Sequence, residues 1–557
     1  MTRPVVAIGL DAADPILLEQ WMEQGHLKTL NRLRQQGAYG RLSSVNHYKA
    51  ETPWTVFLTG ALPEQTGYWG GIKVKNGTYD VENVGAYDFA AYPPFYALGE
   101  DYRVAAVDLP KGTLSDAVNG IQVLAWGAHS PGTPSHSLPN HVLPDLIRRY
   151  GHHPALHKDH GDWWDDAYLT RLYRALQTGI ARRAAMGRDL LQQEDWNLFL
   201  TVFSEPHSAG HDFWCYSQPD HPLYPYVQQK LKDISANPLL DMFVAVDEAI
   251  ATILESAPTD ADVIVFSVHG SDHNTTDVPS MFLLGEWLYR FNFPGKAMIA
   301  PGTVGAPVPP LLLSPKRKTW SGEVWQLKHD PNPIRALLRR SLPSKFHPSI
   351  DRYLGSAQTP DLASPQQLQA AADPFFWQPV SWYKPFWPQM KAYALPSFSE
   401  GYIRVNLKGR EPQGQVEPAD YEALCQTLTD HLHELVNPRT GAAVVKKVVR
   451  SRQTPLDTDP TLPGADLIVE WDDVPTDVID SPGFGRIGPV PYRRTGSHRA
   501  RGFLLATGNG ISPGTQLQQG DIIDLAPTIL ARMGAPIPSR LEGHPLLQPD
   551  AMAIAAP

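Results

Sequence analysis

The stretch Trp196-Asn197-Leu198-Phe199-Leu200-Thr201-Val202-Phe203 runs directly into Ser204-Glu205-Pro206-His207-Ser208-Ala209-Gly210-His211. Its first half is a short, mainly apolar run, which predicts a parallel strand buried on both faces. On a helix or tight helical turn, the spacing of His207 and His211 puts both imidazoles on one face, as a metal ion requires. Functional side chains in open α/β sheets gather just beyond the carboxyl ends of strands. The stretch therefore predicts a strand that delivers two metal ligands.

Other polar side chains follow predicted strands in the same way. The apolar run 262–267 leads to His269, and His498 stands in the turn Thr495-Gly496-Ser497-His498. The first strand, over residues 4–10, ends at Asp11. A carboxylate at that point is either a helix cap or a ligand. These residues extend the candidate site to three further strand ends.

Helices and strands alternate along much of the chain. The apolar spacing predicts helices over residues 165–195 and 238–255, and each leads into a buried strand. This order predicts an α/β fold with a doubly wound, mainly parallel sheet. We expect one core built from residues 1–275 and 395–557. The Pro- and Trp-rich segment 276–394 is expected to be a cap-like, substrate-binding insertion or, alternatively, a packing layer without substrate contact.

Composition narrows the function classes. The 557-residue chain has a formal net charge of −10, which speaks against nucleic acid or an anionic membrane as a partner. Uninterrupted apolar stretches of about 18 residues are missing, and the N-terminus does not resemble a signal peptide. Cys215 and Cys425 are best explained as reduced thiols. These features predict a cytoplasmic protein with a small-molecule substrate, and they leave its oligomeric state open.

Motifs spread from one end of the chain to the other occur in the order found in a known family. They are Ile8-Gly9-Leu10-Asp11, Phe57-Leu58-Thr59-Gly60, Glu205-Pro206-His207 through His211, His269-Gly270, Gly496-Ser497-His498-Arg499 and Asp524-Leu525-Ala526-Pro527-Thr528. The set resembles the alkaline phosphatase superfamily, specifically its type I phosphodiesterase/nucleotide pyrophosphatase branch. The resemblance implies a mainly parallel sheet flanked by helices and metal-dependent hydrolysis of a phosphate ester or diester.

Members of that family hold two metal ions, usually zinc. The ligands that the resemblance carries over are His207, His211 and His498 at one site, and Asp11 and His269 at the other. His207 stands where the family has a carboxylate, and a set of neutral imidazoles favours Zn²⁺. Val268 stands where the second site has an aspartate. The resemblance therefore implies one tight zinc site and a doubtful second one.

The nucleophile position departs from the family. Counting back from Gly60 places it at Ala50, which carries no hydroxyl, whether by nature or by an introduced substitution. Thr52, two residues later, is the candidate nucleophile that remains. Because it precedes Pro53, Thr52 equally fits the N-cap of a helix that has proline at its first position.

Arg494 and Arg499 flank the late histidine and suit an anionic substrate, since arginine binds phosphate or carboxylate bidentately. Ordinary surface charge is the alternative for them. His129 also follows a predicted strand and is either a substrate contact or a structural histidine. Three functions stay open: a phosphate ester or diester hydrolase, a repurposed member that hydrolyses another ester or transfers a group in specialised metabolism, and a metal-binding pseudoenzyme.

Overall fold

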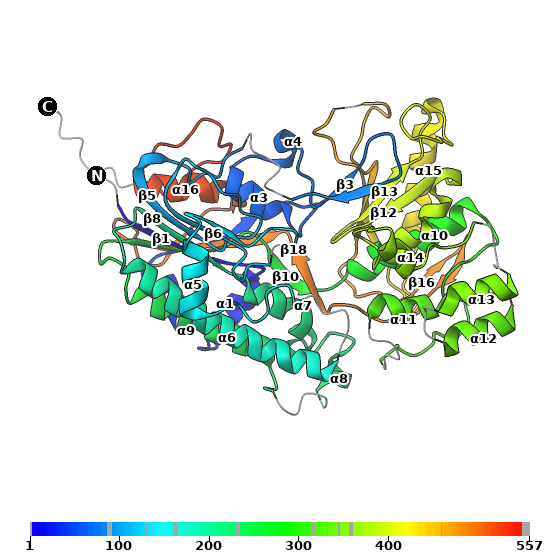
Figure 1. The fold of residues 1–557 in the computed structure, drawn as a ribbon, viewed down its shortest axis with the longest axis horizontal. Coiled ribbons are helices and arrows are strands. Elements are labelled where there is room, and N and C mark those ends of the chain that lie inside the picture. Colours follow the sequence, from blue (N-terminus) through cyan, green and yellow to red (C-terminus); the bar gives the residue numbers. More distant parts are fainter. Residues whose placement is uncertain are drawn as a thin grey trace.

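The computed structural model describes residues 3–85, 92–129, 131–159, 165–228, 234–313, 319–330, 332–342, 346–355, 360–457 and 459–548. The chain forms a larger lobe around a long sheet and a smaller lobe beside it (Figure 1). Within the described ranges, no helix combines the length and the apolar character needed to cross a membrane. Cys215 and Cys425 are both buried and are not joined in a disulfide.

A ten-stranded sheet forms the centre of the larger lobe. In spatial order its strands are β20 (Thr515–Gln516), β2 (Ala38–Ser43), β19 (Arg501–Thr507), β9 (Asp262–Ser267), β1 (Val5–Leu10), β8 (Leu198–Phe203), β5 (Gly99–Val107), β6 (Val118–Leu124) and β7 (His136–Leu138), and β21 (Gly520–Asp521) pairs with β2. The five strands from β9 to β6 run parallel, whereas β19 and β7 pair antiparallel with their neighbours. The predicted α/β fold with a mainly parallel sheet is thereby confirmed.

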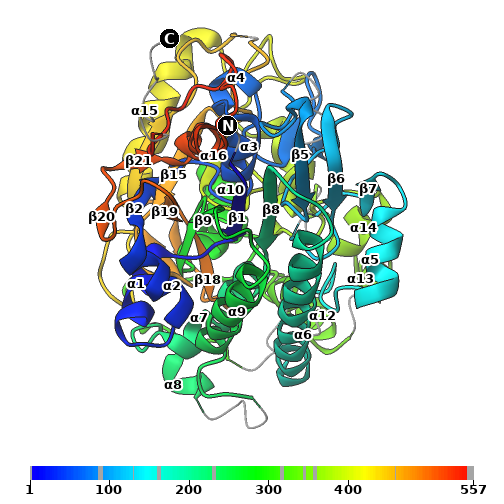
Figure 2. The ribbon, with the colours of Figure 1, turned by 90° about the vertical axis from the view of Figure 1, so that its left-hand side faces the viewer.

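Helices cover both faces of this sheet (Figure 2). Along β1, Ile8 packs in one apolar cluster with residues of α1 (Pro15–Glu23), α2 (Lys28–Gln36), α6 (Asp166–Leu191) and α9 (Pro238–Leu254). Ala7 points to the opposite face and packs in a second cluster with α3 (Thr52–Thr59) and α16 (Leu525–Met533). The remaining helices of this lobe are α4 (Pro63–Thr66), α5 (Val142–Tyr150), α7 (Glu205–Ser217) and α8 (Tyr224–Val227). Because β1 is buried on both faces, it reads as a continuous apolar run.

The smaller lobe is organised around a four-stranded antiparallel sheet in the order β12 (Ala392–Leu395), β13 (Gly401–Val405), β15 (Leu467–Trp471) and β14 (Val445–Arg450). The predicted insertion, residues 276–394, supplies α10 (Leu284–Asn292), α11 (Trp320–Gln326), α12 (Pro333–Ser341), α13 (His347–Leu354) and α14 (Pro365–Ala370). Strands β13 to β15 and α15 (Tyr421–His433) follow that segment in the chain and lie in the same lobe (Figure 1).

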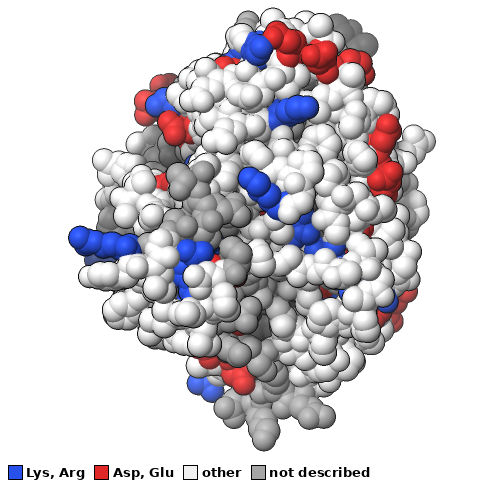
Figure 3. Space-filling model, turned by 90° about the vertical axis from the view of Figure 1, so that its right-hand side faces the viewer, with Lys and Arg blue, Asp and Glu red and all other residues white. Residues whose placement is uncertain are grey.

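Short strands complete the smaller lobe and its connection to the larger one. They are β3 (Ile72–Val74) paired with β4 (Val81–Asn83), and β11 (Pro301–Gly302), β17 (Gly485–Ile487) and β16 (Ile479–Ser481) in a three-stranded sheet. Figure 3 shows the outer face of this lobe, where Asp and Glu gather along the upper and right-hand margins and Lys and Arg lie toward the middle and left.

Candidate metal centre and its cavity

Four chain segments converge at the carboxyl end of β1. Asp11 directly follows β1, and α7, which carries His207 and His211, begins two residues after β8. His269 lies between β9 and the short strand β10 (Gly270–His273). That strand pairs antiparallel with β18 (Gly496–Arg499), which places His498 opposite Ser271. The structure therefore brings all five predicted metal ligands to one edge of the sheet.

His207, His211 and His498 form the first group of candidate ligands, and all three are buried. The Nε2 atoms of His207 and His211 are 3.1 Å apart. The His498 ring centroid lies 4.9 Å from that of His207 and 5.0 Å from that of His211. His211 Nδ1 lies 2.8 Å from the carbonyl oxygen of Gly496, which can only accept, so Nδ1 is the protonated nitrogen. The other nitrogen of His211, Nε2, therefore carries a lone pair.

Asp11, His207 and His269 form the second group. One carboxylate oxygen of Asp11 lies 3.2 Å from His207 Nδ1, and the other lies 3.2 Å from His269 Nε2. The Trp54 indole N–H donates to Asp11 at 2.8 Å and fixes the orientation of the carboxylate. His207 belongs to both groups, because its two ring nitrogens face opposite ways. The second group thus has a third candidate ligand that the sequence assigned only to the first.

The protonation states suit a metal. Burial and then the neighbouring His129 lower the pKa of His207 to about 4. Burial, followed by the charge of Arg494 for His211 and of His269 for His498, holds the pKa of both histidines well below the usual value. Burial of Asp11 would raise its pKa, but His207 and His269 outweigh this and hold it well below the usual value. Neutral imidazole and ionised carboxylate are the forms that bind metals.

Unsatisfied polar atoms provide a test of whether a metal fits. Buried polar atoms normally have hydrogen-bond partners. Among the described residues, the buried nitrogens His207 Nδ1, His269 Nε2 and His498 Nδ1 make no well-aligned hydrogen bond, although the first two lie 3.2 Å from Asp11 oxygens. All three belong to the two ligand groups. A metal ion at each group would satisfy such nitrogens, so the residues present fit the metal centre that the resemblance implies.

Ala50 lies in the turn before α3, and it lines a cavity of about 940 Å³ together with Asp11, His207 and His498. The residue that we predict to occupy the family's nucleophile position therefore lines the same cavity as three of the candidate ligands. It presents a methyl group there instead of a hydroxyl.

Thr52 is fully buried and is not among the residues that line this cavity. Its Oγ1 makes no hydrogen bond to any described residue. Helix α3 begins at Thr52 itself, and its N-cap is Glu51, so the prediction that Thr52 is the N-cap is wrong. Because Thr52 already has helical geometry, its side chain packs inward instead of reaching over the free N–H groups. Asp11 is not a cap either, since Asp14 accepts from Ile16 N at the start of α1.

The two predicted arginines lie in different surroundings. Arg494 lines the cavity, donates through Nε to Asp277 at 2.9 Å, and places Nη1 3.1 Å from His211 Nε2. Arg499 is not among the cavity-lining residues, and its guanidinium donates to Thr275 Oγ1 at 3.3 Å and to the His273 carbonyl at 3.1 Å. Of these two arginines, Arg494 is the one in a position to contact an anion bound in the cavity.

His129 lines the cavity and stacks on His207, with ring centroids 4.2 Å apart. Its Nδ1 lies 2.8 Å from Asp159, and the same carboxylate oxygen accepts from Ser208 Oγ at 2.7 Å. His129 therefore lines the site and packs against the ring of His207, a candidate metal ligand.

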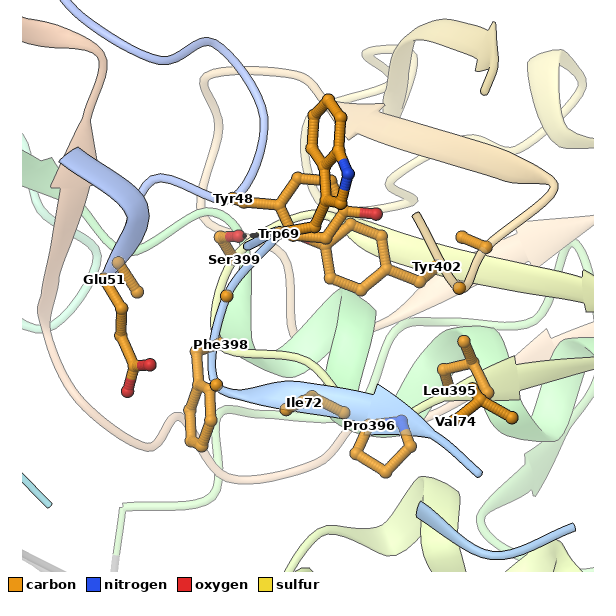
Figure 4. A pocket seen from close by; sticks show the side chains of 15 residues that line it. Tyr48, Glu51, Trp69, Ile72, Val74, Leu395, Pro396, Phe398, Ser399 and Tyr402 are labelled. Carbon is orange, nitrogen blue, oxygen red and sulfur yellow. Dashed lines mark hydrogen bonds between the residues drawn. The ribbon is translucent and has the colours of Figure 1, made fainter. Parts of the chain in front are cut away.

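Both lobes contribute to the cavity. The side of the larger lobe carries the histidines, and the opposite wall includes Phe375, Phe376, Trp377 and Phe398 of the smaller lobe. Ala50, Glu51 and Phe398 also line a neighbouring pocket of about 40 Å³. Figure 4 shows that pocket with Glu51 at one side and the aromatic side chains of Trp69 and Tyr402 at the other.

Some site residues carried no sequence signal. Lys111 lines the cavity with a backbone φ of 56° and forms an ion pair of 2.8 Å with Glu51, which also accepts from Tyr68 OH at 2.9 Å. Trp54 lies just before the motif Phe57-Leu58-Thr59-Gly60 without belonging to it, and it orients Asp11 from α3. Both residues act through contacts between segments distant in the chain, which spacing within one segment cannot indicate. The Asp11–Trp54 contact spans 43 residues.

Comparison with known proteins places these observations in a family. The sequence profile of the type I phosphodiesterase/nucleotide pyrophosphatase family matches residues 5–290, which is more than half of the chain. No curated protein sequence matches the chain. Among solved structures, phosphonoacetate hydrolase from Sinorhizobium meliloti 1021 shares 12% identity over 96% of each chain, with a TM-score of 0.47. Murine and human ectonucleotide pyrophosphatase/phosphodiesterase 5 share 10% identity over 96% of each chain, with TM-scores of 0.45.

The assignment rests on the profile match, which covers β1, β8 and β9 with the ligands that follow them. The chain therefore belongs to the type I phosphodiesterase/nucleotide pyrophosphatase family, and the predicted hydrolase class is confirmed.

Proposed function

We propose that the protein is a metal-dependent hydrolase that acts on a phosphate ester or diester of a small anionic molecule, with zinc as the metal. The observation that carries the proposal is the pair of ligand groups that share His207, because members of both groups line the cavity. A ligand set of imidazoles with one carboxylate suits Zn²⁺ better than Mg²⁺ or Ca²⁺, which prefer oxygen.

The chain's own residues have separable roles in this proposal. His207, His211 and His498 would hold one ion, and Asp11, His269 and the second nitrogen of His207 would hold another. When bound, such ions polarise the phosphoryl group and neutralise its developing charge. Trp54 holds the Asp11 carboxylate in place, and the Gly496 carbonyl fixes the His211 ring. Arg494 binds a phosphoryl oxygen through its guanidinium N–H groups.

Water is the proposed nucleophile. Among the described residues that line the cavity, only Thr319 and Ser321 carry hydroxyl side chains, and both belong to the smaller lobe. The oxygen of water attacks phosphorus, the ester P–O bond breaks, and the alcohol departs with a proton that derives from that water. The hydrolysis then proceeds in one displacement, without a phosphorylated side chain.

A second candidate function is a metal-binding pseudoenzyme that holds an anionic ligand in the same cavity. The methyl group of Ala50 at the nucleophile position favours it. The two candidates differ in turnover and agree in metal binding.

An assay panel tests the proposal. Bis-p-nitrophenyl phosphate, p-nitrophenyl phosphate and p-nitrophenyl acetate are offered to the protein with zinc and with chelator. Zinc-dependent release of nitrophenol from a phosphate substrate supports the hydrolase. Hydrolysis of p-nitrophenyl acetate but of neither phosphate substrate would indicate a repurposed esterase. Tight zinc binding without any turnover would indicate the pseudoenzyme.

A further inference from the structure

Two consecutive arginines in the irregular segment before β18 line the cavity and have different neighbours there. Arg494 contacts Asp277 and His211, on the metal side. The Arg493 guanidinium carbon lies 4.0 Å from the centre of the Trp377 ring and 5.8 Å from that of Trp320, both in the smaller lobe. Both arginines line the same cavity. One short segment therefore supplies two positive charges to the cavity, one beside the candidate metal ligand His211 and one beside the two tryptophans.

The surroundings of Arg493 suit the binding of a planar oxyanion. The Arg493 guanidinium lies over the Trp377 ring, which attracts it, and its Nη1 contacts Met281 Sδ at 3.5 Å. A guanidinium carries five N–H groups in one plane, so this contact engages only part of it. Two of those N–H groups match the spacing of two oxygens of a carboxylate or phosphate. Arg493 is only 8% exposed, so a charge pair there is screened less than one on the surface.

The cavity that both arginines line is larger than a phosphoryl group needs. The cavity measures about 940 Å³, which is at the upper end of the range for pockets that bind drug-sized molecules. The wall near Arg493 includes Phe375, Phe376 and Trp377. Aromatic walls favour a flat apolar group, because stacking adds to the burial of its surface.

We propose that Arg493 and Trp377 form a second anion subsite, and that the substrate is an aromatic molecule with two oxyanion groups. The phosphoryl group lies at the metal centre beside Arg494, the ring lies against the aromatic wall, and a carboxylate or second phosphate binds Arg493. The position of the phosphoryl group rests on the proposed function, whereas the second subsite rests on the cavity and on Arg493.

Binding of uncleavable ligands tests this subsite without any need for turnover. Isothermal titration calorimetry compares phenylphosphonate, 4-phosphonobenzoate and 1,4-phenylenediphosphonate on the zinc-supplemented protein. We expect the two ligands with a second oxyanion to bind roughly ten-fold tighter or more than phenylphosphonate. The better of the two shows whether the subsite prefers a carboxylate or a phosphate-like group.

Variants test whether Arg493 and Trp377 are responsible for the tighter binding. Arg493→Met should remove the preference and leave phenylphosphonate binding unchanged, and Arg493→Lys should retain part of it. Trp377→Leu should weaken all three ligands. Arg148→Met, which changes an exposed arginine of α5, serves as the matched control. Metal content and circular dichroism confirm that each variant is folded.

Equal affinity for all three ligands, or a preference that persists in folded Arg493→Met, would overturn the second subsite. Hydrolysis of p-nitrophenyl phosphate, measured in parallel, reports on the proposed function separately. Tighter binding of the two-oxyanion ligands without any turnover would support the subsite and contradict the hydrolase proposal. Turnover without such a binding preference would support the hydrolase and contradict the subsite.

Discussion

The Nε2 atoms of His207 and His211 lie 3.1 Å apart on one face of α7, and the hydrogen bond from His211 Nδ1 to the Gly496 carbonyl leaves a lone pair on His211 Nε2. His207 turns its other nitrogen toward Asp11, 3.2 Å away. The His207 imidazole therefore lies between two sets of ligand atoms. A substitution in one set should consequently also change metal binding by the other.

Removing a ligand of the first group should strip metal from the protein. Replacing His211 by Ala deletes one of three imidazoles, and we expect zinc affinity to fall by roughly 100-fold or more. Mass-spectrometric metal analysis after dialysis measures the bound equivalents. His141→Ala, at an exposed histidine before α5, should keep the wild-type content. Unchanged zinc in folded His211→Ala would contradict the assignment.

A hydroxyl introduced at position 50 should change the reaction pathway. Ala50→Ser places an oxygen at a position that lines the cavity beside the ligands. We expect this variant to form a phosphorylated protein with an activated phosphate ester, whereas the wild type does not. Intact-protein mass spectrometry of acid-quenched samples detects the added phosphoryl group. Labelling of the wild type itself would exclude direct attack by water.

Thr52→Val tests the alternative nucleophile. The Thr52 hydroxyl is buried without a hydrogen bond to any described residue, so an isosteric methyl removes an unsatisfied polar group. We expect catalytic rates to stay within about two-fold, and the free energy of unfolding to rise by about 1 kcal/mol. Steady-state kinetics and urea denaturation measure the two quantities. Loss of activity with the fold intact would make Thr52 the nucleophile.

Asp212 gives the metal-free protein a pH-dependent stability. Burial raises the pKa of Asp212 to about 7 from the usual 3.8, and Tyr168 OH donates to it at 2.9 Å. The folded state therefore binds this proton more tightly than the unfolded state. The resulting stabilisation is fully present below pH 3.8 and is lost as the pH rises through about 7.

Asp212→Asn should abolish the loss of stability that the wild type shows as the pH rises. Above pH 8, the variant should be more stable than the wild type by on the order of 4 kcal/mol, and the difference should shrink toward pH 4. Urea unfolding of chelated protein across this range provides the measurement. Asp260→Asn, at an exposed position, is the control. Parallel pH curves for wild type and Asp212→Asn would disprove the role of this carboxyl group.

Arg494 should contribute mainly to substrate binding. Arg494→Lys keeps the positive charge but loses the fork that bonds Asp277 and reaches His211. We expect kcat/KM for a phosphate ester to fall by roughly ten-fold or more. Arg499→Lys, whose guanidinium bonds Thr275 and His273 outside the cavity, should have a smaller effect. Equal losses in both variants would contradict the distinction.

The sequence predicts those parts of the fold that depend on local pattern. Strand β8 and helix α7 follow from an apolar run and a histidine pair, and α9 follows from its amphipathic spacing. The start of α3 was wrong by one residue, because Thr52-Pro53 fits a cap equally well until tertiary packing draws Thr52 inward. The roles of Trp54 and Lys111 could not be predicted for the same reason. Both depend on contacts that form only when distant segments of the chain pack together.

The position of β19 has a consequence for synthesis of the chain. This strand lies between β2 and β9. The N-terminal β2 therefore cannot join the sheet until residues 501–507 have been synthesised. His498 emerges from the ribosome at the same late stage. A growing chain can therefore acquire the helix that bears His207 and His211 early, yet it completes the three-histidine group only when translation is nearly finished. Pulse-labelled nascent chains should accordingly take up metal late, in step with the closure of the sheet.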